Sequence, residues 1–243
     1  MKKSFKMISS LILSLFIFSF IGINVNAEEC RKVIVIDPGH GGIDGGGKSA
    51  SGILEKDINL SIALKTKAAL ESKGYKVVMT RTEDVGLYSE GKNTREKKRE
   101  DLANRVKIKK ESKCDVFISI HQNMFPQKSC KGAQVWSAGN EASKKLGQII
   151  QDKFKLEVDA TNKRVPKVAK KEYRILNDNY EGASLILECG FLSNPEEGEL
   201  LAKEDYQAKI ANAISKSLDE YFEGNGVTQI PPESDKKEET SKS

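Results

Sequence analysis

The chain has 243 residues, of which 38% are hydrophobic and 31% are charged, and its 40 Lys and Arg against 35 Asp and Glu give a formal net charge of +5. A chain of this length can bury one sizeable core. The near balance of charge, with no ladder of aromatic residues beside the basic runs, argues against a nucleic-acid-binding protein.

Residues 1–27 carry the pattern of an export signal. Three lysines precede the apolar run "MISSLILSLFIFSFIGI", and Val25 and Ala27 are placed for cleavage by signal peptidase. An uncleaved membrane anchor is the alternative, because the apolar run is near the lower length limit for crossing a bilayer. Both interpretations put the protein outside the cytoplasmic membrane, and this segment contacts the membrane only if it is uncleaved.

Residues 28–222 alternate β-rich runs with helical patterns, which predicts one α/β domain with an open, mostly parallel, twisted sheet and helices on both faces. The expected strands are "KVIVID" (32–37), "KVVMTR" (76–81), "DVFISI" (115–120) and "SLILEC" (184–189), and the expected helices are 54–72, 101–112, 141–154 and 205–222. In such a sheet, functional groups gather at the carboxyl ends of the strands. Residues 223–243 are polar and charged, which predicts a disordered tail.

The chain has only two histidines, His40 and His121. His121 directly follows an expected apolar strand, and His40 lies three residues beyond the end of another. A single histidine in this position is most often a structural hydrogen-bonding residue, but two in the same arrangement suggest a shared site. Gly39, Gly41 and Gly42 flank His40, and we expect these glycines to leave backbone room for a bulky substrate.

Two glutamates complete a candidate site. Glu55 begins the first long helical pattern, where an acid also favours the helix dipole, and Glu188 ends the apolar run "SLILEC", where an unpaired charge is costly unless it has an internal ion-pair partner. Two imidazoles and a carboxylate are the ligand set of hydrolytic zinc enzymes. The residues therefore predict a metallohydrolase that binds one Zn²⁺, with Glu188 as general base and acid.

Four segments carry a family resemblance: "VIVIDPGHGGIDGG", "LEKDINLSIA", "SIHQN" and "LECGFLSNPEE". In this order and spacing they closely resemble the zinc-dependent N-acetylmuramoyl-L-alanine amidases, which cut the amide between N-acetylmuramic acid and the L-alanine of the peptidoglycan stem peptide. The resemblance implies that His40, Glu55 and His121 are the zinc ligands and that Glu188 is the catalytic glutamate. Asn123 is a candidate substrate contact, with closure of the turn as the alternative.

The short architecture, with an amino-terminal apolar segment and no wall-binding repeats, is most similar to the germination-specific amidases of endospore formers. This similarity implies action on spore cortex peptidoglycan during formation of muramic-δ-lactam, in the cell wall or the spore intermembrane space. Some division amidases insert a self-blocking helix before the catalytic glutamate, and this chain has no room for one. We therefore expect control by the timing of expression or by a separate exported activator.

Two other functions stay open: a zinc peptidase that trims stem peptides, and a noncatalytic peptidoglycan-binding module that keeps the fold. The four cysteines are also open. They lie far apart without a C-x-x-C pair, which disfavours a structural zinc site. Cys114 and Cys130 are the candidate disulfide, Cys189 is expected to be a buried free thiol, and Cys30 has no assigned partner.

Overall fold

The structure is a computed structural model that describes residues 31–171 and 173–224. The predicted export signal at residues 1–27, Cys30, and the predicted tail beyond Gly224 lie outside the described residues. Among the helices that are described, none combines the length and the apolar character needed to cross a bilayer.

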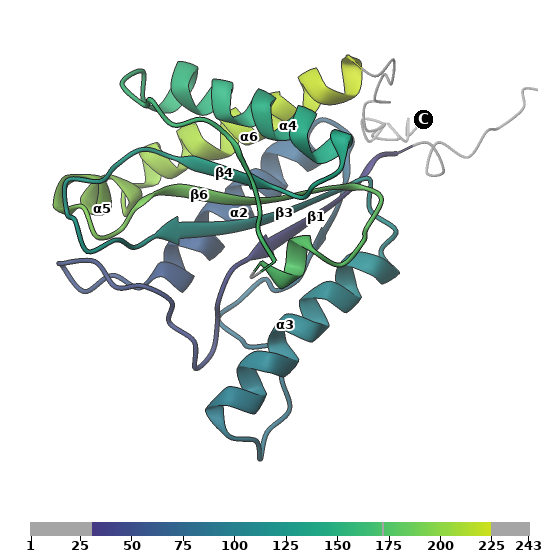
Figure 1. The fold of residues 1–243 in the computed structure, drawn as a ribbon, viewed down its shortest axis with the longest axis vertical. Helices are drawn as coiled ribbons and strands as arrows, with labels where there is room; N and C mark the ends of the chain where they lie inside the picture. Colours follow the sequence, from purple (N-terminus) through teal and green to yellow (C-terminus); the bar gives the residue numbers. More distant parts are fainter. Residues whose placement is uncertain (1–30, 172, 225–243) are drawn as a thin grey trace, which may run out of the picture. The chain divides into compact units, whose positions relative to one another are not determined.

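Six strands form one open sheet in the order β2-β1-β3-β6-β4-β5 (Figure 1). Strands β2, β1, β3 and β6 are parallel, β4 runs antiparallel to β6, and β5 pairs in parallel with β4. The strands are β1 (Val33–Pro38), β2 (Lys76–Met79), β3 (Val116–Asn123), β4 (Gln134–Ser137), β5 (Lys167–Val168) and β6 (Ala183–Phe191). The predicted fold class is confirmed, and the four expected strands form its parallel part.

Three long helices cover one face of the sheet: α2 (Glu55–Glu71), α4 (Glu141–Lys153) and α6 (Glu204–Glu223) (Figure 1). A π-helical turn, η2 (Phe154–Val158), extends α4, and the short helix α5 (Pro195–Leu201) follows β6. Alternate strand residues such as Ile34, Ile36 and Ile118 point to this face and form the main core with the three helices. Burial of such side chains stabilises the fold by about 1.5–3 kcal/mol each.

Helix α3 (Thr94–Glu111) lies on the opposite face, together with the 3₁₀ turn η3 (Arg174–Leu176) (Figure 1). The strand residues that alternate with those of the main core, including Val35, Phe117 and Ile186, form a smaller apolar cluster here. The central strands are thus covered on both faces, which explains why they read as nearly continuous apolar runs.

Helix α3 begins seven residues earlier than predicted, because its first turns contain no apolar residue. The signal that marks its start is a capping box, in which Asn93 and Glu96 each bond the other's backbone N–H. Helix α5 was not predicted either, although Asn194 caps it and Pro195 occupies its first turn. Strands β4 and β5 are too short to stand out in the sequence.

The candidate disulfide between Cys114 and Cys130 is not formed, since both cysteines are free. Cys114 lies before the first residue of β3, and Cys130 lies beyond its last residue, so the length of the strand separates them. Cys189 is a buried free thiol, as expected.

Candidate metal centre

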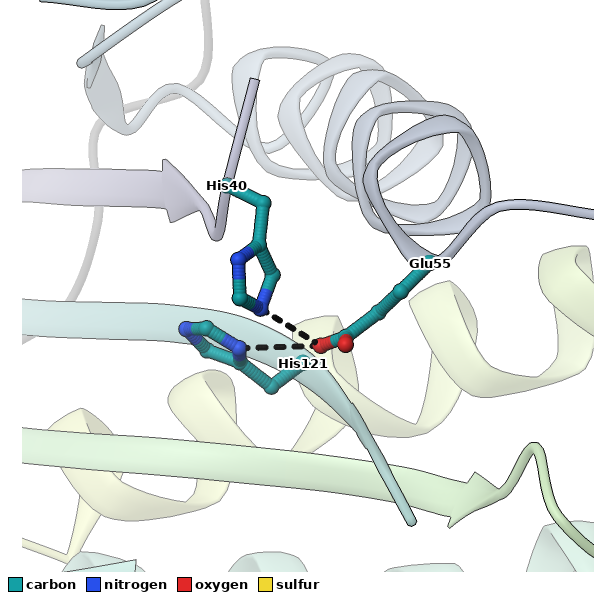
Figure 2. Close-up of side chains that lie close together, drawn as sticks. All are labelled: His40, Glu55 and His121. Carbon is teal, nitrogen blue, oxygen red and sulfur yellow. Dashed lines mark hydrogen bonds and ion pairs between the residues drawn. The ribbon is translucent and has the colours of Figure 1, made fainter. Parts of the chain in front are cut away.

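The three predicted ligands converge at the carboxyl ends of β1 and β3 (Figure 2). His40 lies on the turn after β1, and Glu55 is the first residue of α2. His121 is the third residue from the end of β3, inside the strand and not after it. The Nε2 atom of His40 is 3.2 Å from Oε1 of Glu55, and Nδ1 of His121 is 3.0 Å from the same oxygen. One ligand atom from each residue lies within 4.8 Å of the other two.

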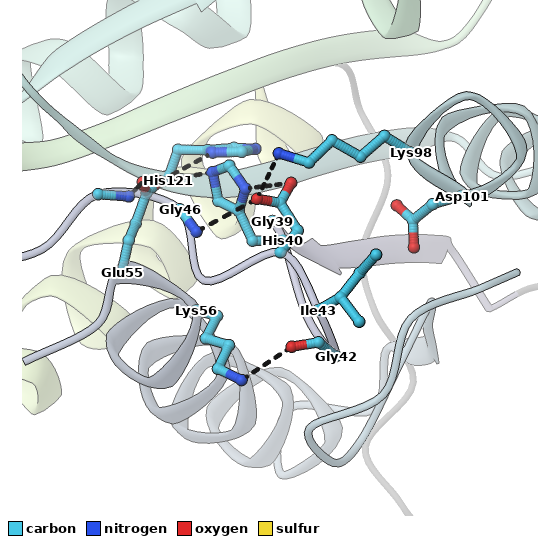
Figure 3. Close-up of polar contacts among 12 residues, drawn as sticks. Gly39, His40, Gly42, Ile43, Gly46, Glu55, Lys56, Lys98, Asp101 and His121 are labelled. Atoms are coloured by element: carbon cyan, nitrogen blue, oxygen red, sulfur yellow. Dashed lines mark hydrogen bonds and ion pairs between the residues drawn. The ribbon is translucent and has the colours of Figure 1, made fainter. Parts of the chain in front are cut away.

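The turn after β1 aims His40 at Glu55. His40 has a left-handed backbone with φ of 63°, which costs a non-glycine residue on the order of 1–3 kcal/mol. Reciprocal backbone hydrogen bonds between Gly41 and Asp44 close the turn. Nδ1 of His40 donates to Oδ2 of Asp44 at 3.0 Å, which leaves Nε2 to face Glu55. Lys98 extends from α3 toward this turn and donates to Oδ1 of Asp44 at 2.9 Å (Figure 3).

A buried ion pair supports the His40 turn from the α3 side. Asp37, at 1% exposure, accepts hydrogen bonds from Thr80, Ser119 and Arg105. Burial opposes its ionisation, but the Arg105 guanidinium and the two hydroxyls outweigh that effect and lower the pKa of Asp37. Arg105 also donates to the carbonyl oxygen of His40 at 2.6 Å, so the guanidinium couples a buried carboxylate to the backbone of a candidate ligand.

The glycines around His40 do not leave room for substrate, and that expectation is wrong. A Cβ atom on Gly39 would lie 2.2 Å from Cε1 of His121, so the space beside Gly39 holds the His121 ring. The space beside Gly41 and Gly42 is filled by the loop at residues 85–88. These glycines allow the protein's own segments to approach one another closely.

Glu55 is 4% exposed and is bound through both carboxylate oxygens. Oε1 accepts from both histidines and from the backbone N–H of Gln122, and Oε2 accepts from the backbone N–H of Gly47. Burial would raise the pKa of Glu55, but the hydrogen bonds from His121 and His40 hold it well below its usual range. Burial likewise opposes protonation of His40, while Asp44 and Glu55 outweigh burial and raise the pKa of His40 to about 9.

This donor set fits a zinc ion. Both imidazole protons point at one carboxylate oxygen, so a cation that replaces them meets two ring nitrogens and a carboxylate oxygen, as in hydrolytic zinc sites. The carboxylate that orients His40 from its other nitrogen is the outer partner that metal-binding histidines usually have.

Glu188 lies beside this centre, because it pairs with His121 in the register of β6 against β3. Its Oε2 atom is buried and has no hydrogen-bond partner among the described residues, and they provide no ion pair for it. Burial raises the pKa of Glu188 to about 7. A carboxylate with a free oxygen and this pKa is suited to proton transfer near neutral pH.

Asn123 is the last residue of β3 and pairs in register with Phe191. Its backbone oxygen accepts from Leu192, so the main chain rather than the side chain holds this end of the strand. Three residues around the centre were not predicted from the sequence: Asp44, Asn59 and Arg105. The first two lie four residues after a predicted ligand, and this spacing is their only local signal.

Comparisons with known proteins identify the family of the chain. A family model for N-acetylmuramoyl-L-alanine amidases matches residues 34–220. The chain is 37% identical to the germination-specific N-acetylmuramoyl-L-alanine amidase of Bacillus subtilis, over 96% of this chain and 100% of that protein. It is 31% identical to the amidase AmiC of Neisseria meningitidis, over 79% of this chain and 53% of that protein.

Two solved amidases share the fold. One is the CwlD amidase from Clostridioides difficile in complex with the GerS lipoprotein, with a TM-score of 0.78 and 41% identity over 80% of this chain and 100% of that chain. The other is AmiC2 of Nostoc punctiforme, with a TM-score of 0.65 and 26% identity over 79% of this chain and 97% of that chain. The chain therefore belongs to the N-acetylmuramoyl-L-alanine amidase family, a family of peptidoglycan hydrolases.

Proposed function

We propose that this amidase depends on one Zn²⁺ held by His40, Glu55 and His121, with Glu188 as its catalytic glutamate. The observation that carries the proposal is the convergence of three ligand atoms within 4.8 Å beside a glutamate whose buried oxygen has no partner in the described chain. The bond cut is the amide between the lactyl group of N-acetylmuramic acid and the L-alanine of the stem peptide.

A zinc ion in this centre supplies Lewis acidity, which polarises a carbonyl oxygen and lowers the pKa of water. Glu188 accepts a proton from the attacking water, whose oxygen bonds to the lactyl carbonyl carbon. Glu188 then gives that proton to the alanine nitrogen as the carbon–nitrogen bond breaks. A glutamate pKa near 7 suits both transfers, since the group takes up and releases a proton at neutral pH.

Asn123 is proposed to bind substrate. It lies two residues after His121 on the same strand, and its side-chain amide forms no hydrogen bond within the described chain. An amide in this position offers a donor and an acceptor to a sugar or peptide group that enters beside His121.

The setting is proposed from the relatives. The Bacillus subtilis relative is germination-specific, and the Clostridioides difficile relative was solved with a lipoprotein. The germination-specific relative supports a role in germination, and we propose action on spore cortex peptidoglycan on the route to muramic-δ-lactam, after export across the cytoplasmic membrane. The complex of the second relative supports a partner protein, which we propose to be an exported activator.

Product identity tests the proposal. The purified protein, stripped with a chelator and then supplied with zinc or left without it, is incubated with spore cortex peptidoglycan. Mass spectrometry then identifies the released products. Zinc-dependent release of intact stem peptides that begin with L-alanine is the expected result. Shortened stems would indicate a peptidase, and binding without any product from the zinc-loaded protein, even with its lipoprotein partner, would indicate a noncatalytic module.

A further inference from the structure

One buried amide contacts all three segments that carry the candidate ligands. Asn59 lies one turn after Glu55 on α2 and is 0% exposed. Its Nδ2 atom donates to the carbonyl oxygen of Gly39 at 3.2 Å and to Oε1 of Glu55 at 3.4 Å. Its Oδ1 atom accepts from Nε2 of Gln122 at 3.1 Å. Gly39 precedes His40, and Gln122 follows His121, so the contacts reach the neighbours of both histidines.

The chemistry of these partners requires an amide. A carbonyl oxygen and a carboxylate only accept hydrogen bonds, and the Gln122 amide group presents a donor, so the residue between them must donate on one side and accept on the other. An aspartate would place an acceptor against two acceptors. A leucine of similar size would leave the partners unpaired, at about 1–3 kcal/mol for each buried group.

The position is otherwise apolar. The neighbours of Asn59 on the buried face of α2 include Ile58, Ile62 and Ala63, which pack into the main core. Asparagine is a poorer helix former than most apolar residues, and a buried amide is costly to desolvate. Helix packing alone therefore does not account for an asparagine here, whereas the alignment of three separate segments does.

We propose that Asn59 is a positioning residue that sets the spacing of the three metal-binding segments. It holds the carboxylate of Glu55 in register with the His40 turn on one side and with the end of β3 on the other. This inference rests on the proposed zinc site. Arg81 also donates to the Gly39 oxygen at 3.0 Å, and the Gln122 backbone still donates to Glu55, so the fold keeps other links when Asn59 is replaced.

The test compares Asn59→Leu with Thr66→Val. Thr66 is also 0% exposed on α2, and its hydroxyl donates to the Ile62 carbonyl of its own helix. Its replacement therefore matches the burial of Asn59 without a contact to the site among the described residues. Zinc affinity is measured by competition with a chromophoric chelator. The Co²⁺ absorption spectrum reports the ligand geometry, and thermal unfolding in excess chelator reports the fold.

Asn59→Leu is expected to weaken zinc binding by about 10- to 100-fold and to shift the Co²⁺ spectrum, as loss of outer partners of metal ligands does. Thr66→Val is expected to keep the wild-type zinc affinity and spectrum. Unchanged zinc affinity and spectrum in Asn59→Leu would overturn the proposal, and so would an equal loss in Thr66→Val. Absence of zinc binding by the wild-type protein would refute the metal centre itself, and the role of Asn59 with it.

Gln122→Met keeps the test decisive if Asn59→Leu fails to fold. It removes the donor that meets Oδ1 of Asn59 and keeps the backbone N–H that binds Glu55. We expect a smaller loss of zinc affinity, of a few-fold, with a shifted Co²⁺ spectrum. Wild-type affinity and spectrum in Gln122→Met would contradict the coupling of the β3 end to Asn59.

Discussion

Helices α2 and α3 lie on opposite faces of the sheet, and they support the same centre by different means. The buried residues of α2 are mainly apolar, and the helix contributes Glu55 directly. The buried residues of α3 are Arg105 and Lys109, both charged, and the helix holds the His40 turn from behind. Apolar packing thus fixes the ligand-bearing helix, whereas buried hydrogen-bonded charges attach its counterpart.

The second charge on α3 follows the same rule. The ammonium of Lys109 is 0% exposed, donates to the Ile175 carbonyl and to Asp178, and lies over the rings of Phe117 and Tyr180. Buried charged side chains of this kind are sensitive to truncation, because removal of one partner leaves the other buried and unpaired. The α3 side should therefore tolerate substitution less well than its few apolar contacts suggest.

The largest effect is expected at Glu188, which neither helix carries and which is therefore a reference for both. Glu188→Gln keeps the size of the side chain but cannot accept the proton, so turnover should fall by roughly 10²- to 10⁴-fold. Zinc content and unfolding temperature should stay at wild-type values. His121→Ala is the matched contrast, since it should lose the metal. Wild-type rates in Glu188→Gln would refute the proton-transfer role.

On the α3 side, the largest loss of stability is expected on substitution of Arg105. Arg105→Met leaves Asp37 buried without its cation and should lower the free energy of unfolding by about 3–5 kcal/mol, measured by urea denaturation. The double variant Asp37→Asn with Arg105→Met removes both charges and should recover part of that loss. A cost below about 1 kcal/mol for Arg105→Met would contradict a charged attachment of α3.

Asp44 tests whether the His40 ring must be held from its outer nitrogen. Asp44→Ala removes the acceptor for Nδ1 and should weaken zinc binding by about 10- to 100-fold, measured by chelator competition. Lys98→Met is the control, because it removes only the half-exposed ion pair to Asp44 and should change affinity by less than about fivefold. Equal affinity in Asp44→Ala and wild type would show that the turn alone orients His40.

The pH profile gives the smallest effect, about tenfold for each pH unit. Burial raises the pKa of Glu188 from 4.5 to about 7, and the base must be ionised to accept a proton. Activity should therefore fall as the pH drops through about 7, well above the ordinary titration range of a glutamate. The measurement is kcat/KM against pH on a soluble muramyl-peptide fragment. An acidic limb near 4.5 would show that the buried environment does not set the proton-transfer step.

The spacing of apolar residues and the composition of the short runs were sufficient to predict the parallel core. Ile34 to Ile36 and Ala183 to Leu187 are buried on both faces, so their apolar runs could be recognised without any partner. The edge strands β4 and β5 could not be predicted in this way, because four and two residues are too few to show a pattern. Helix α3 was predicted only where Leu102 and Val106 supply apolar spacing.

The four candidate site residues could be selected from the sequence because each follows or interrupts a strong pattern. The supporting residues could not, since their roles depend on contacts between distant segments. Arg105 meets Asp37 across 68 positions of sequence, and Asn59 meets Gln122 across 63. A local pattern carries no trace of such pairs. Likewise, the space beside Gly39 could be assigned to His121 only from the fold.

The pairing of His121 with Glu188 has a consequence for how the enzyme matures. The two residues are neighbours in the sheet, but their strands, β3 and β6, are joined by a long crossover. The parallel strands β1 and β3 are likewise joined by a long crossover. Parallel pairings of this kind form late, because the chain must close large loops before they contribute stability. The proposed site is therefore complete only once β6 has paired with β3, and a chain without this pairing lacks the arrangement proposed for hydrolysis.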